Sequence, residues 1–341
     1  MGEAPRAAVA TPPAPTIMTF ANNQLLAALV GVNDRHLARF EQRLGIELSA
    51  RGNSVVLQGA EAECAVAKLA LDDLYARLEK GQAVGDGDVD GAIRLAEAVV
   101  HRKESDALGA AQRHEIRTKK RTIMPRNANQ SRYVEALRGQ TLVFGLGPAG
   151  TGKTYLTVAV AVQMLITGQV DRIVLSRPAV EAGERLGFLP GDLREKVDPY
   201  LRPIYDALFD MLPADEVHKR LENGEIEVAP LAFMRGRTLA NSFVLLDEAQ
   251  NTTPMQMKML LTRIGENSRM AVTGDPSQVD LPPGTRSGLV DALEVLAGVE
   301  GIVTIRFSHD DVVRHAMVTR IVRAYDARDD RKAAGKTGDA S

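Results

Sequence analysis

The feature that most constrains this chain is the octapeptide Gly147–Thr154, which reads Gly-Pro-Ala-Gly-Thr-Gly-Lys-Thr. It matches the pattern G-x-x-x-x-G-K-[ST] at every fixed position. Glycines let a backbone turn its N–H groups inward around a polyphosphate. The apolar run Leu142–Gly145 predicts a strand before this loop. Lys153–Ile166 predicts a helix after it, whose positive end also favours phosphate. The sequence therefore predicts a binding site for a nucleoside triphosphate.

Each residue type in this loop has a place in nucleotide binding. Lys153 would supply a point charge to the outer phosphates, and the Thr154 hydroxyl would ligate Mg²⁺. We expect ATP rather than GTP, because the sequence lacks an Asn-Lys-x-Asp motif for reading guanine. The expected nucleotide-binding residues of the loop are Gly147, Pro148, Ala149, Gly150, Thr151, Gly152, Lys153 and Thr154.

Two acidic residues follow a second apolar strand. The run Val244–Leu246 leads directly into Asp247 and Glu248. In such an arrangement the first acid holds Mg²⁺ and the second orients and activates the attacking water. A base beside the metal ligand separates hydrolases from simple nucleotide binders, so we expect ATP hydrolysis. The alternative is an exposed helix N-terminus, where the helix dipole favours acids.

Other polar residues could complete the site. Gln278 ends a Thr-Gly-Asp-Pro-Ser-Gln run after a further strand and could sense the γ-phosphate. Gln130 could read the adenine edge, because an amide both donates and accepts hydrogen bonds. Hydrolysis also gains from an arginine that neutralises charge in the transition state. We favour Arg314 as a phosphate sensor and Arg237 as an element contributed between subunits.

The order of elements predicts an α/β fold. Short apolar strands such as Arg172–Ser176 and Arg269–Thr273 alternate with helices, and their composition suits strands buried on both faces of a parallel sheet. We expect a P-loop NTPase core of the RecA or helicase type with a mostly parallel sheet, preceded by a small α+β domain. The expected boundaries are a disordered tail at 1–18, the α+β domain at 19–85, a helical and basic connector at 86–128, the P-loop domain at 129–327 and a second tail at 328–341.

Composition narrows the functional classes. The net charge is -2, so any basic surface for nucleic acid would have to be local, as in the connector. The single cysteine, Cys64, excludes an internal disulfide framework and a cysteine zinc site, and the chain is typical of a cytoplasmic protein. The longest apolar helix, Val158–Ile166, is too short to span a bilayer, so we expect no membrane association.

Taken together, these stretches resemble the PhoH-like family of P-loop ATPases. The matching segments, between about Ile116 and Arg323, are Ser176–Val180, Gly183–Asp192, Met234–Leu239, Leu246–Asn251 and Thr273–Gln278. The resemblance implies a core like that of superfamily-1 RNA helicases and a ring of subunits, with a hexamer as the expected form. It also implies a role in RNA metabolism that includes ribosome and rRNA maturation, with an endoribonuclease or ribosomal partner.

The region before the connector resembles the KH-like domain that some members of this family carry. A KH module grips the RNA backbone with a G-x-x-G loop. The corresponding loop here is Gly31–Asp34, with Asp34 where the second glycine belongs. An acid at that position would repel phosphate, so we expect this domain to dock protein rather than RNA.

Two functions fit the same site residues. One is an ATP-driven RNA motor or remodelling enzyme. Because the chain has room for one such core, a motor would need neighbouring subunits. The other is a binding or assembly switch, whose ATP state sets affinity for a ribosomal or nuclease partner and whose slow turnover is indifferent to RNA. A P-loop kinase fits less well, since nothing marks an acceptor pocket and Glu248 is better placed to activate water.

Overall fold

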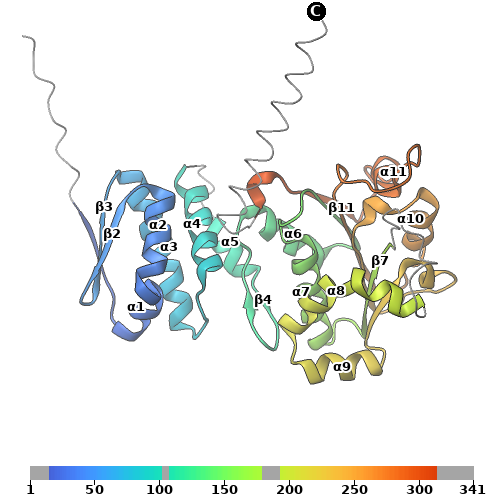
Figure 1. The fold of residues 1–341 in the computed structure, drawn as a ribbon, viewed down its shortest axis with the longest axis horizontal. Helices are drawn as coiled ribbons and strands as arrows, with labels where there is room; N and C mark the ends of the chain where they lie inside the picture. Colours follow the sequence, from blue (N-terminus) through green and yellow to red (C-terminus); the bar gives the residue numbers. More distant parts are fainter. Residues whose placement is uncertain (1–14, 102–106, 179–192, 313–341) are drawn as a thin grey trace, which may run out of the picture. The chain divides into compact units, whose positions relative to one another are not determined.

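A computed structural model describes residues 15–101, 107–178 and 193–312. The chain forms two compact units (Figure 1). The first combines 1–139 with 159–171 and 205–226, and the second combines 140–158, 172–204 and 227–341. In the part of the chain that the structure describes, no helix has both the length and the apolar character that crossing a bilayer requires.

The first unit begins with three antiparallel strands in the order β1–β3–β2. These are β1 (Thr16–Thr19), β2 (Glu47–Arg51) and β3 (Ser54–Gln58). A two-residue turn, Gly52 and Asn53, joins β2 to β3, and Gly52 adopts a φ of 62° that favours glycine. Strands β2 and β3 therefore form a β-hairpin.

Four helices complete this N-terminal module, namely α1 (Asn23–Val30), α2 (Arg35–Leu44), α3 (Glu61–Glu79) and α4 (Asp86–His101). A short 3₁₀ helix, η1 (Val32–Asp34), links the first two. The side chains of Phe40, Leu57, Leu71 and Ile93 are fully buried in one apolar core, which thus draws on α2, β3, α3 and α4. The predicted α+β character of this region is confirmed.

The limits of this module differ from those predicted. The stretch predicted as a disordered tail, 1–18, includes most of strand β1. Met18 in this strand is buried in the core, and the strand pairs with β3. Helix α4 falls in the stretch predicted as a connector, 86–128, but it belongs to the N-terminal module. Its apolar side chains, including Val89 and Ile93, pack in the same core. The Gly-Asp-rich run that indicated a boundary is instead the start of α4, where the Asp88 carboxylate accepts from the Gly85 N–H at 3.0 Å.

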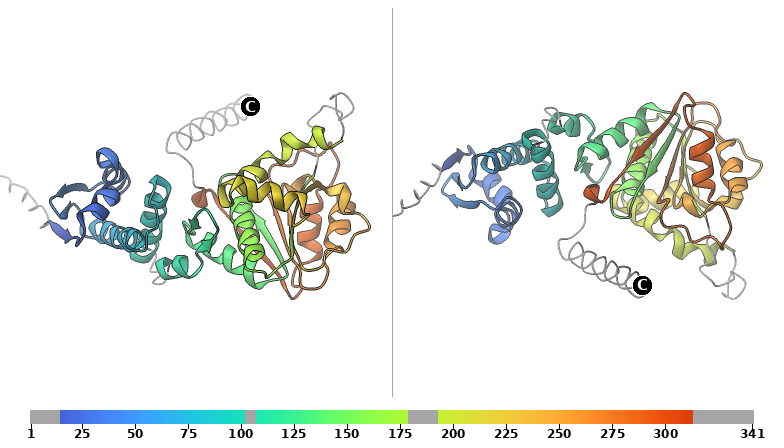
Figure 2. Two further views of the ribbon diagram at one scale, coloured as in Figure 1. Left: turned by 90° about the horizontal axis from the view of Figure 1, so that it is seen from below. Right: turned by 90° about the horizontal axis from the view of Figure 1, so that it is seen from above.

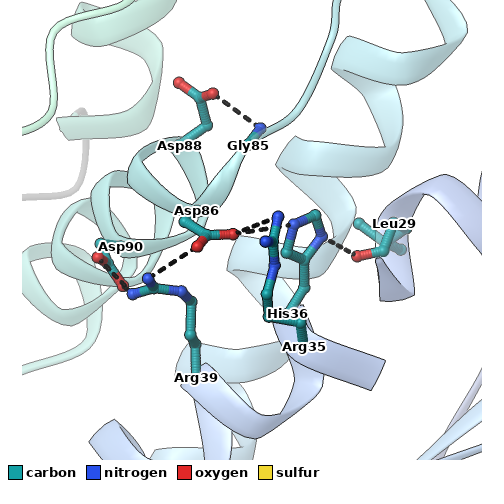
Figure 3. Close-up of polar contacts among 8 residues, drawn as sticks. All are labelled: Leu29, Arg35, His36, Arg39, Gly85, Asp86, Asp88 and Asp90. Atoms are coloured by element: carbon teal, nitrogen blue, oxygen red, sulfur yellow. Dashed lines mark hydrogen bonds and ion pairs between the residues drawn. The ribbon is translucent and has the colours of Figure 1, made fainter. Parts of the chain in front are cut away.

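A cluster of charged side chains fastens α2 to α4 (Figure 3). Asp86, in the first turn of α4, lies 2.9 Å from Arg35 and 3.0 Å from Arg39. The Nε2 atom of His36 lies 3.6 Å from the same carboxylate, and Arg39 also contacts Asp90 at 2.9 Å. Opposite charges on two helices therefore neutralise one another at this contact.

The first unit continues through α5 (Ala107–Arg113), the strand pair β4 (Ile116–Arg117) and β5 (Thr122–Ile123), and α6 (Ala128–Gly139). Basic residues of the predicted connector occupy the β4–β5 turn and are held by α8 (Leu193–Met211) and α9 (Ala214–Glu222). The contacts are Lys119 with Glu216 at 2.8 Å, Lys120 Nζ with the Phe209 carbonyl at 2.6 Å and Arg121 with Asp210 at 2.8 Å. Much of the connector's positive charge is thus taken up by structural contacts.

The second unit is built on a six-stranded sheet in the order β11–β6–β10–β9–β7–β8. The strands are β6 (Leu142–Leu146), β7 (Arg172–Arg177), β8 (Ile226–Pro230), β9 (Ser242–Leu246), β10 (Arg269–Gly274) and β11 (Ile302–Arg306). The pairings from β11 through to β7 are parallel. Figure 2 shows these strands side by side. All but β8 were predicted, and the expected α/β P-loop NTPase fold with a mostly parallel sheet is confirmed.

Helix α7 (Lys153–Ile166) follows β6 over the predicted residues. Helices α10 (Pro254–Leu261) and α11 (Gly288–Val295) share one apolar core with side chains of the sheet, including Phe144, Val244 and Val272. Three short 3₁₀ helices lie in loops, namely η3 (Leu231–Met234), η4 (Ala249–Asn251) and η5 (His309–Asp311). Ser308 and Asp311 form a capping box at the start of η5.

Candidate functional site

The parallel sheet gathers the predicted motifs at one edge. Neighbouring strands end in register, with Leu146 of β6 opposite Gly274 of β10 and Ser176 of β7 opposite Leu246 of β9. The residues that follow each strand therefore emerge side by side, as the carboxyl ends of parallel strands do at a ligand site.

The glycine-rich loop needs glycine for two separate reasons. Gly147, Gly150 and Gly152 have positive φ angles of 135°, 83° and 86°, which L-residues with side chains rarely adopt. At Gly147 a Cβ atom would also lie 2.3 Å from the carbonyl oxygen of Phe307, the residue after β11. Backbone conformation and close packing thus both require the glycine that opens the loop.

Lys153 is held by its own loop. Its side chain is buried, and its Nζ donates to the carbonyls of Gly147 at 2.6 Å and Pro148 at 2.9 Å. Burial lowers the pKa of this amine from its ordinary value, against the charges of Asp247, Asp275 and Glu248, which act to raise it. Among the residues that the structure describes, no carboxylate forms an ion pair with Lys153. Its ammonium group is bonded to neutral carbonyls, and a phosphate could replace them as its partner.

The first acid lies beside the phosphate loop. The Thr154 hydroxyl donates to Asp247 Oδ1 at 2.8 Å, and the hydroxyl of Thr273, in β10, donates to the same oxygen at 2.6 Å. Asp247 itself is only 5% exposed, and its backbone N–H donates to the Ser176 carbonyl at 2.9 Å. The structure thus brings Thr154 and Asp247 together across 93 residues of sequence.

These two residues fit a magnesium ion. Mg²⁺ prefers oxygen ligands and in nucleotide sites takes one or two protein oxygens together with phosphates and water. A hydroxyl and a carboxylate oxygen 2.8 Å apart supply such a pair. Within the described ranges no group of three or more His, Cys, Asp or Glu residues could hold a metal ion, so an all-protein cage is not the arrangement this part of the chain offers.

The second acid is fixed on both of its oxygens. Glu248 Oε1 lies 3.1 Å from Arg177 Nη2 at the end of β7, and Oε2 accepts from Gln250 Nε2 at 2.6 Å. Its backbone is left-handed, with a φ of 52°, which is uncommon for a residue with a side chain. The side chain is 38% exposed, so water can reach it, whereas Asp247 next to it is enclosed.

Gln278 lies in the loop after β10 and bonds within it. Its side-chain amide donates to Asp275 Oδ2 at 2.8 Å, and Ser277 donates to Asp275 Oδ1. The Asp275 N–H in turn donates to Gln250 Oε1 at 3.1 Å. Hydrogen bonds through Asp275 and Gln250 thus connect Gln278 to Glu248, and its role as a γ-phosphate sensor stays a prediction.

The remaining predicted residues are placed less directly. The Gln130 side chain is buried in α6, where its Oε1 accepts from the Arg126 N–H at 2.7 Å, and its reading of adenine stays a prediction. Both Nη atoms of Arg237 donate to Glu227 at 2.6 Å, and this pairing raises the pKa of the arginine. Its intersubunit role is likewise untested, and Arg314 lies outside the described residues.

Thr273 and Gln250 were given no role from the sequence, although both lie in motifs that it singles out. The available signal was position. Thr273 is the polar residue near the end of an otherwise apolar strand, and Gln250 is the amide two residues after the second acid. Thr273 bonds to Asp247 and Gln250 to Asp275, each beyond the end of a neighbouring strand, so only the fold could reveal these contacts.

The first unit contains a separate polar cavity of about 410 Å³. Its cationic lining consists of Arg77, Lys80, Arg113 and Arg117, with Glu115 as the acidic member. Arg117 pairs with Glu115, and the buried Arg77 pairs with Asp73 at 2.5 Å. The lining thus carries four cationic side chains and one carboxylate, and two of the four cations pair with acids.

Comparison with known proteins places this arrangement in a family. The family model described as PhoH-like protein matches residues 122–326. A PhoH-like protein of Bacillus subtilis (strain 168) is 48% identical over 301 residues, which cover 88% of this chain and 93% of that protein. Another from Mycobacterium tuberculosis (strain ATCC 25618 / H37Rv) is 48% identical over 302 residues, covering 88% and 85%.

Other matches cover less of both chains. Protein PhoH of Escherichia coli (strain K12) is 49% identical over 205 residues, which are 60% of this chain and 58% of that protein. Among solved structures, the Sulfolobus solfataricus SWI2/SNF2 ATPase core in complex with dsDNA matches at 17% identity and a TM-score of 0.30, over 52% of this chain and 42% of that chain. A likeness as remote as the last carries no argument about function.

Proposed function

This chain belongs to the PhoH-like protein family, and on that premise we propose that it binds ATP with Mg²⁺ at Gly147–Thr154 and hydrolyses it. The observation that carries the proposal is the 2.8 Å contact between Thr154 and Asp247, with Glu248 as the next residue. A phosphate loop, a metal-ligating pair and a water-accessible carboxylate then lie at one sheet edge, which is what phosphoryl transfer to water needs.

The residues divide the work of hydrolysis as follows. Lys153 leaves the carbonyls of its loop and contacts the outer phosphates. Glu248 accepts a proton from the water that attacks the γ-phosphorus, the bond to the β,γ-bridging oxygen breaks, and ADP and phosphate leave. Mg²⁺ held by Thr154 and Asp247 would neutralise charge on the phosphate oxygens.

The direct test is Glu248→Gln. Binding of ATP should persist, because the amide keeps the shape of the side chain, while turnover should fall by about a hundredfold or more, as expected when a general base is removed. Turnover is measured as phosphate release, with nucleotide affinity measured by calorimetry. Glu266→Gln, at an exposed glutamate of the same unit, is the matched control. Turnover within threefold of wild type would place the base elsewhere.

We propose further that the ATPase acts on RNA, and that the polar cavity of the first unit contacts its backbone phosphates. The four cationic side chains of its lining support this proposal, because phosphate contacts dominate RNA affinity. Two of them are paired with acids, Arg117 with Glu115 and Arg77 with Asp73. The β4–β5 turn is a poorer candidate, since Lys119 and Arg121 are already paired with acids.

RNA binding can be tested on this cavity. Lys80→Ala combined with Arg113→Ala should weaken binding of a single-stranded oligonucleotide. The slope of its affinity against salt should fall by about one unit for each phosphate that the protein no longer neutralises. Lys68→Ala, at an exposed lysine of the same helix that precedes Lys80, is the control. An unchanged salt slope in the double variant would remove the cavity from the RNA proposal.

The alternative is an ATP-dependent binding or assembly switch in the cytoplasm, with a ribosomal or endoribonuclease partner. The same site residues serve both functions. A remodelling enzyme should turn over several-fold faster with RNA, whereas a switch should not respond. We also propose a homo-oligomer, with a hexameric ring as the form that would let cores of neighbouring subunits move against one another. Mass measurement in solution with and without ATP tests this state.

A further inference from the structure

Gln250 joins two motifs of the nucleotide site. Its side chain is 2% exposed, and both ends of its amide are bonded. Nε2 donates to Glu248 Oε2 at 2.6 Å, and Oε1 accepts from the Asp275 N–H at 3.1 Å. The first partner follows β9 and the second follows β10, so one buried amide bridges the ends of two neighbouring strands.

The two hydrogen-bond partners of Gln250 require a side chain that both donates and accepts, as an amide does. A carboxylate only accepts and a backbone N–H only donates, so the bridging side chain must do both. Glutamate at this position would repel Glu248, and methionine would satisfy neither partner. The partners also fix the orientation of the amide, with nitrogen toward Glu248 and oxygen toward Asp275.

The backbone around this side chain is arranged to admit it. A Cβ atom on Gly274, the last residue of β10, would lie 2.6 Å from Gln250 Oε1. The Gln250 carbonyl accepts from the Ser287 hydroxyl at 2.8 Å, which holds the residue from its other side. The glycine at the end of β10 thus leaves room for the amide, and Ser287 holds its backbone in place.

We infer that Gln250 is a positioning residue that couples the Glu248 carboxylate to the loop after β10, which contains Asp275 and Gln278. The inference rests on the proposed function, since it assigns a coupling role within that site. A shift of the Asp275 backbone pulls on the amide oxygen, and the amide nitrogen passes the shift to the carboxylate that activates water. Arg177 holds the other oxygen of Glu248, so the carboxylate can pivot about that contact.

Three variants test this coupling. Gln250→Met removes both bonds at nearly constant size, and Gln250→Glu keeps the acceptor toward Asp275 but places like charges together. The double variant Glu248→Gln with Gln250→Glu exchanges the two groups. It restores a donor facing an acceptor and an acceptor for the Asp275 N–H. The readouts are hydrogen exchange of the segment around Asp275, with and without ADP and Mg²⁺, and kcat and KM for ATP.

Gln250→Met should speed exchange at Asp275 and lower kcat by about tenfold, the factor expected for removing a hydrogen bond to a charged group, with KM changed less than threefold. In the same variant ADP should no longer alter exchange at Asp275. The double variant should regain wild-type exchange while hydrolysis stays abolished, because residue 248 is no longer a carboxylate. The recovery shows that the two hydrogen bonds themselves hold the Asp275 segment. The fall in kcat with KM nearly unchanged, and the loss of the ADP response in Gln250→Met, are the results that a purely structural role would not give.

Two results would overturn the inference. One is unchanged exchange at Asp275 in Gln250→Met. The other is faster exchange across the whole unit with no recovery in the double variant. Failure of the proposed function reads differently, since wild-type protein would then release no phosphate. The exchange measurements on nucleotide-free protein would still decide whether Gln250 holds Asp275.

Discussion

Two clusters of charged residues in this protein differ in how their charges are compensated. We call the group of Arg35, His36, Arg39 and Asp86 the N-terminal cluster and compare it with the candidate nucleotide site. Between α2 and α4, Asp86 is met by Arg35, His36 and Arg39, so the positive and negative groups satisfy one another (Figure 3). At the nucleotide site, Lys153 is held by carbonyls and Asp247 by hydroxyls. Opposite charges lie near each other there, yet no ion pair joins Lys153 to a carboxylate of the described residues.

Lys153 and Asp247 differ in this respect from Asp86, and also from Glu248, which pairs with Arg177. A buried charge that already has a charged partner gains little from a ligand, because binding would first break the pair. A charge held by neutral dipoles gains more when an oppositely charged ligand arrives. Burial lowers the pKa of Lys153, although the charges of Asp247, Asp275 and Glu248 act to raise it. The N-terminal cluster should therefore govern stability, and the nucleotide site should govern binding.

The largest effect should come from Lys153→Ala. Removing a charge that contacts phosphate should weaken ATP binding by about a hundredfold or more, since each hydrogen bond to a charged group contributes about 1.5–3 kcal/mol. The stability of the fold should change much less, because the amine leaves behind two carbonyls and the Thr151 hydroxyl, all of them neutral. Calorimetric titration measures the first and thermal unfolding the second, with the exposed Lys258→Ala as control. Unchanged affinity would mean that this cluster is structural too.

A second substitution tests the N-terminal cluster through its geometry. Gly31 has a φ of 80°, and a Cβ atom there would lie 2.9 Å from Cγ of His36. Gly31→Ala should thus destabilise the module by about 2 kcal/mol or more, combining backbone strain with displacement of His36. Gly45→Ala is the matched control, because Gly45 has a φ of 66° with nothing within 4 Å. Equal destabilisation of α2 in both variants, measured by hydrogen exchange, would show that His36 can move without penalty.

The arrangement of the candidate nucleotide site was largely predictable, because its residues lie in contiguous motifs; their roles stay predictions. The glycines, Lys153 and Thr154 are consecutive, and Asp247 and Glu248 end an apolar strand. Parallel strands bring their carboxyl ends together whatever the loops contain. The bridging role of Gln250 was not predictable, because its second partner is a backbone N–H from another strand.

The N-terminal cluster, in contrast, was not predicted from the sequence. The run Gly85–Asp88 has the composition of a linker, and that composition predicted a domain boundary there. Its acids instead start α4, where Asp86 meets basic residues that lie about fifty positions earlier in the chain. Composition cannot distinguish an acid that solvates a linker from one that pairs with α2. Pairing between distant positions decides that, and it depends on the fold.

The smallest effect should come from Asp86→Asn, and the direction in which its loss of stability changes with pH can be checked. Burial acts to raise the pKa of Asp86, but the hydrogen bond and charge of Arg39 and the charges of Arg35 and His36 outweigh it, so the pKa lies below the ordinary 3.8. The carboxylate therefore stabilises the folded module fully above that pH, and the contribution disappears as the pH falls through the lower folded value.

At pH 7 the variant should be less stable by about 1 kcal/mol, as for a partly exposed ion pair. Exchange of α2 and α4 should show this difference shrinking below pH 3.8, whereas the exposed Glu47→Gln should show no such convergence. A difference that stays constant down to the acid limit would mean that size and hydrogen bonding, rather than charge, make Asp86 the partner of α2.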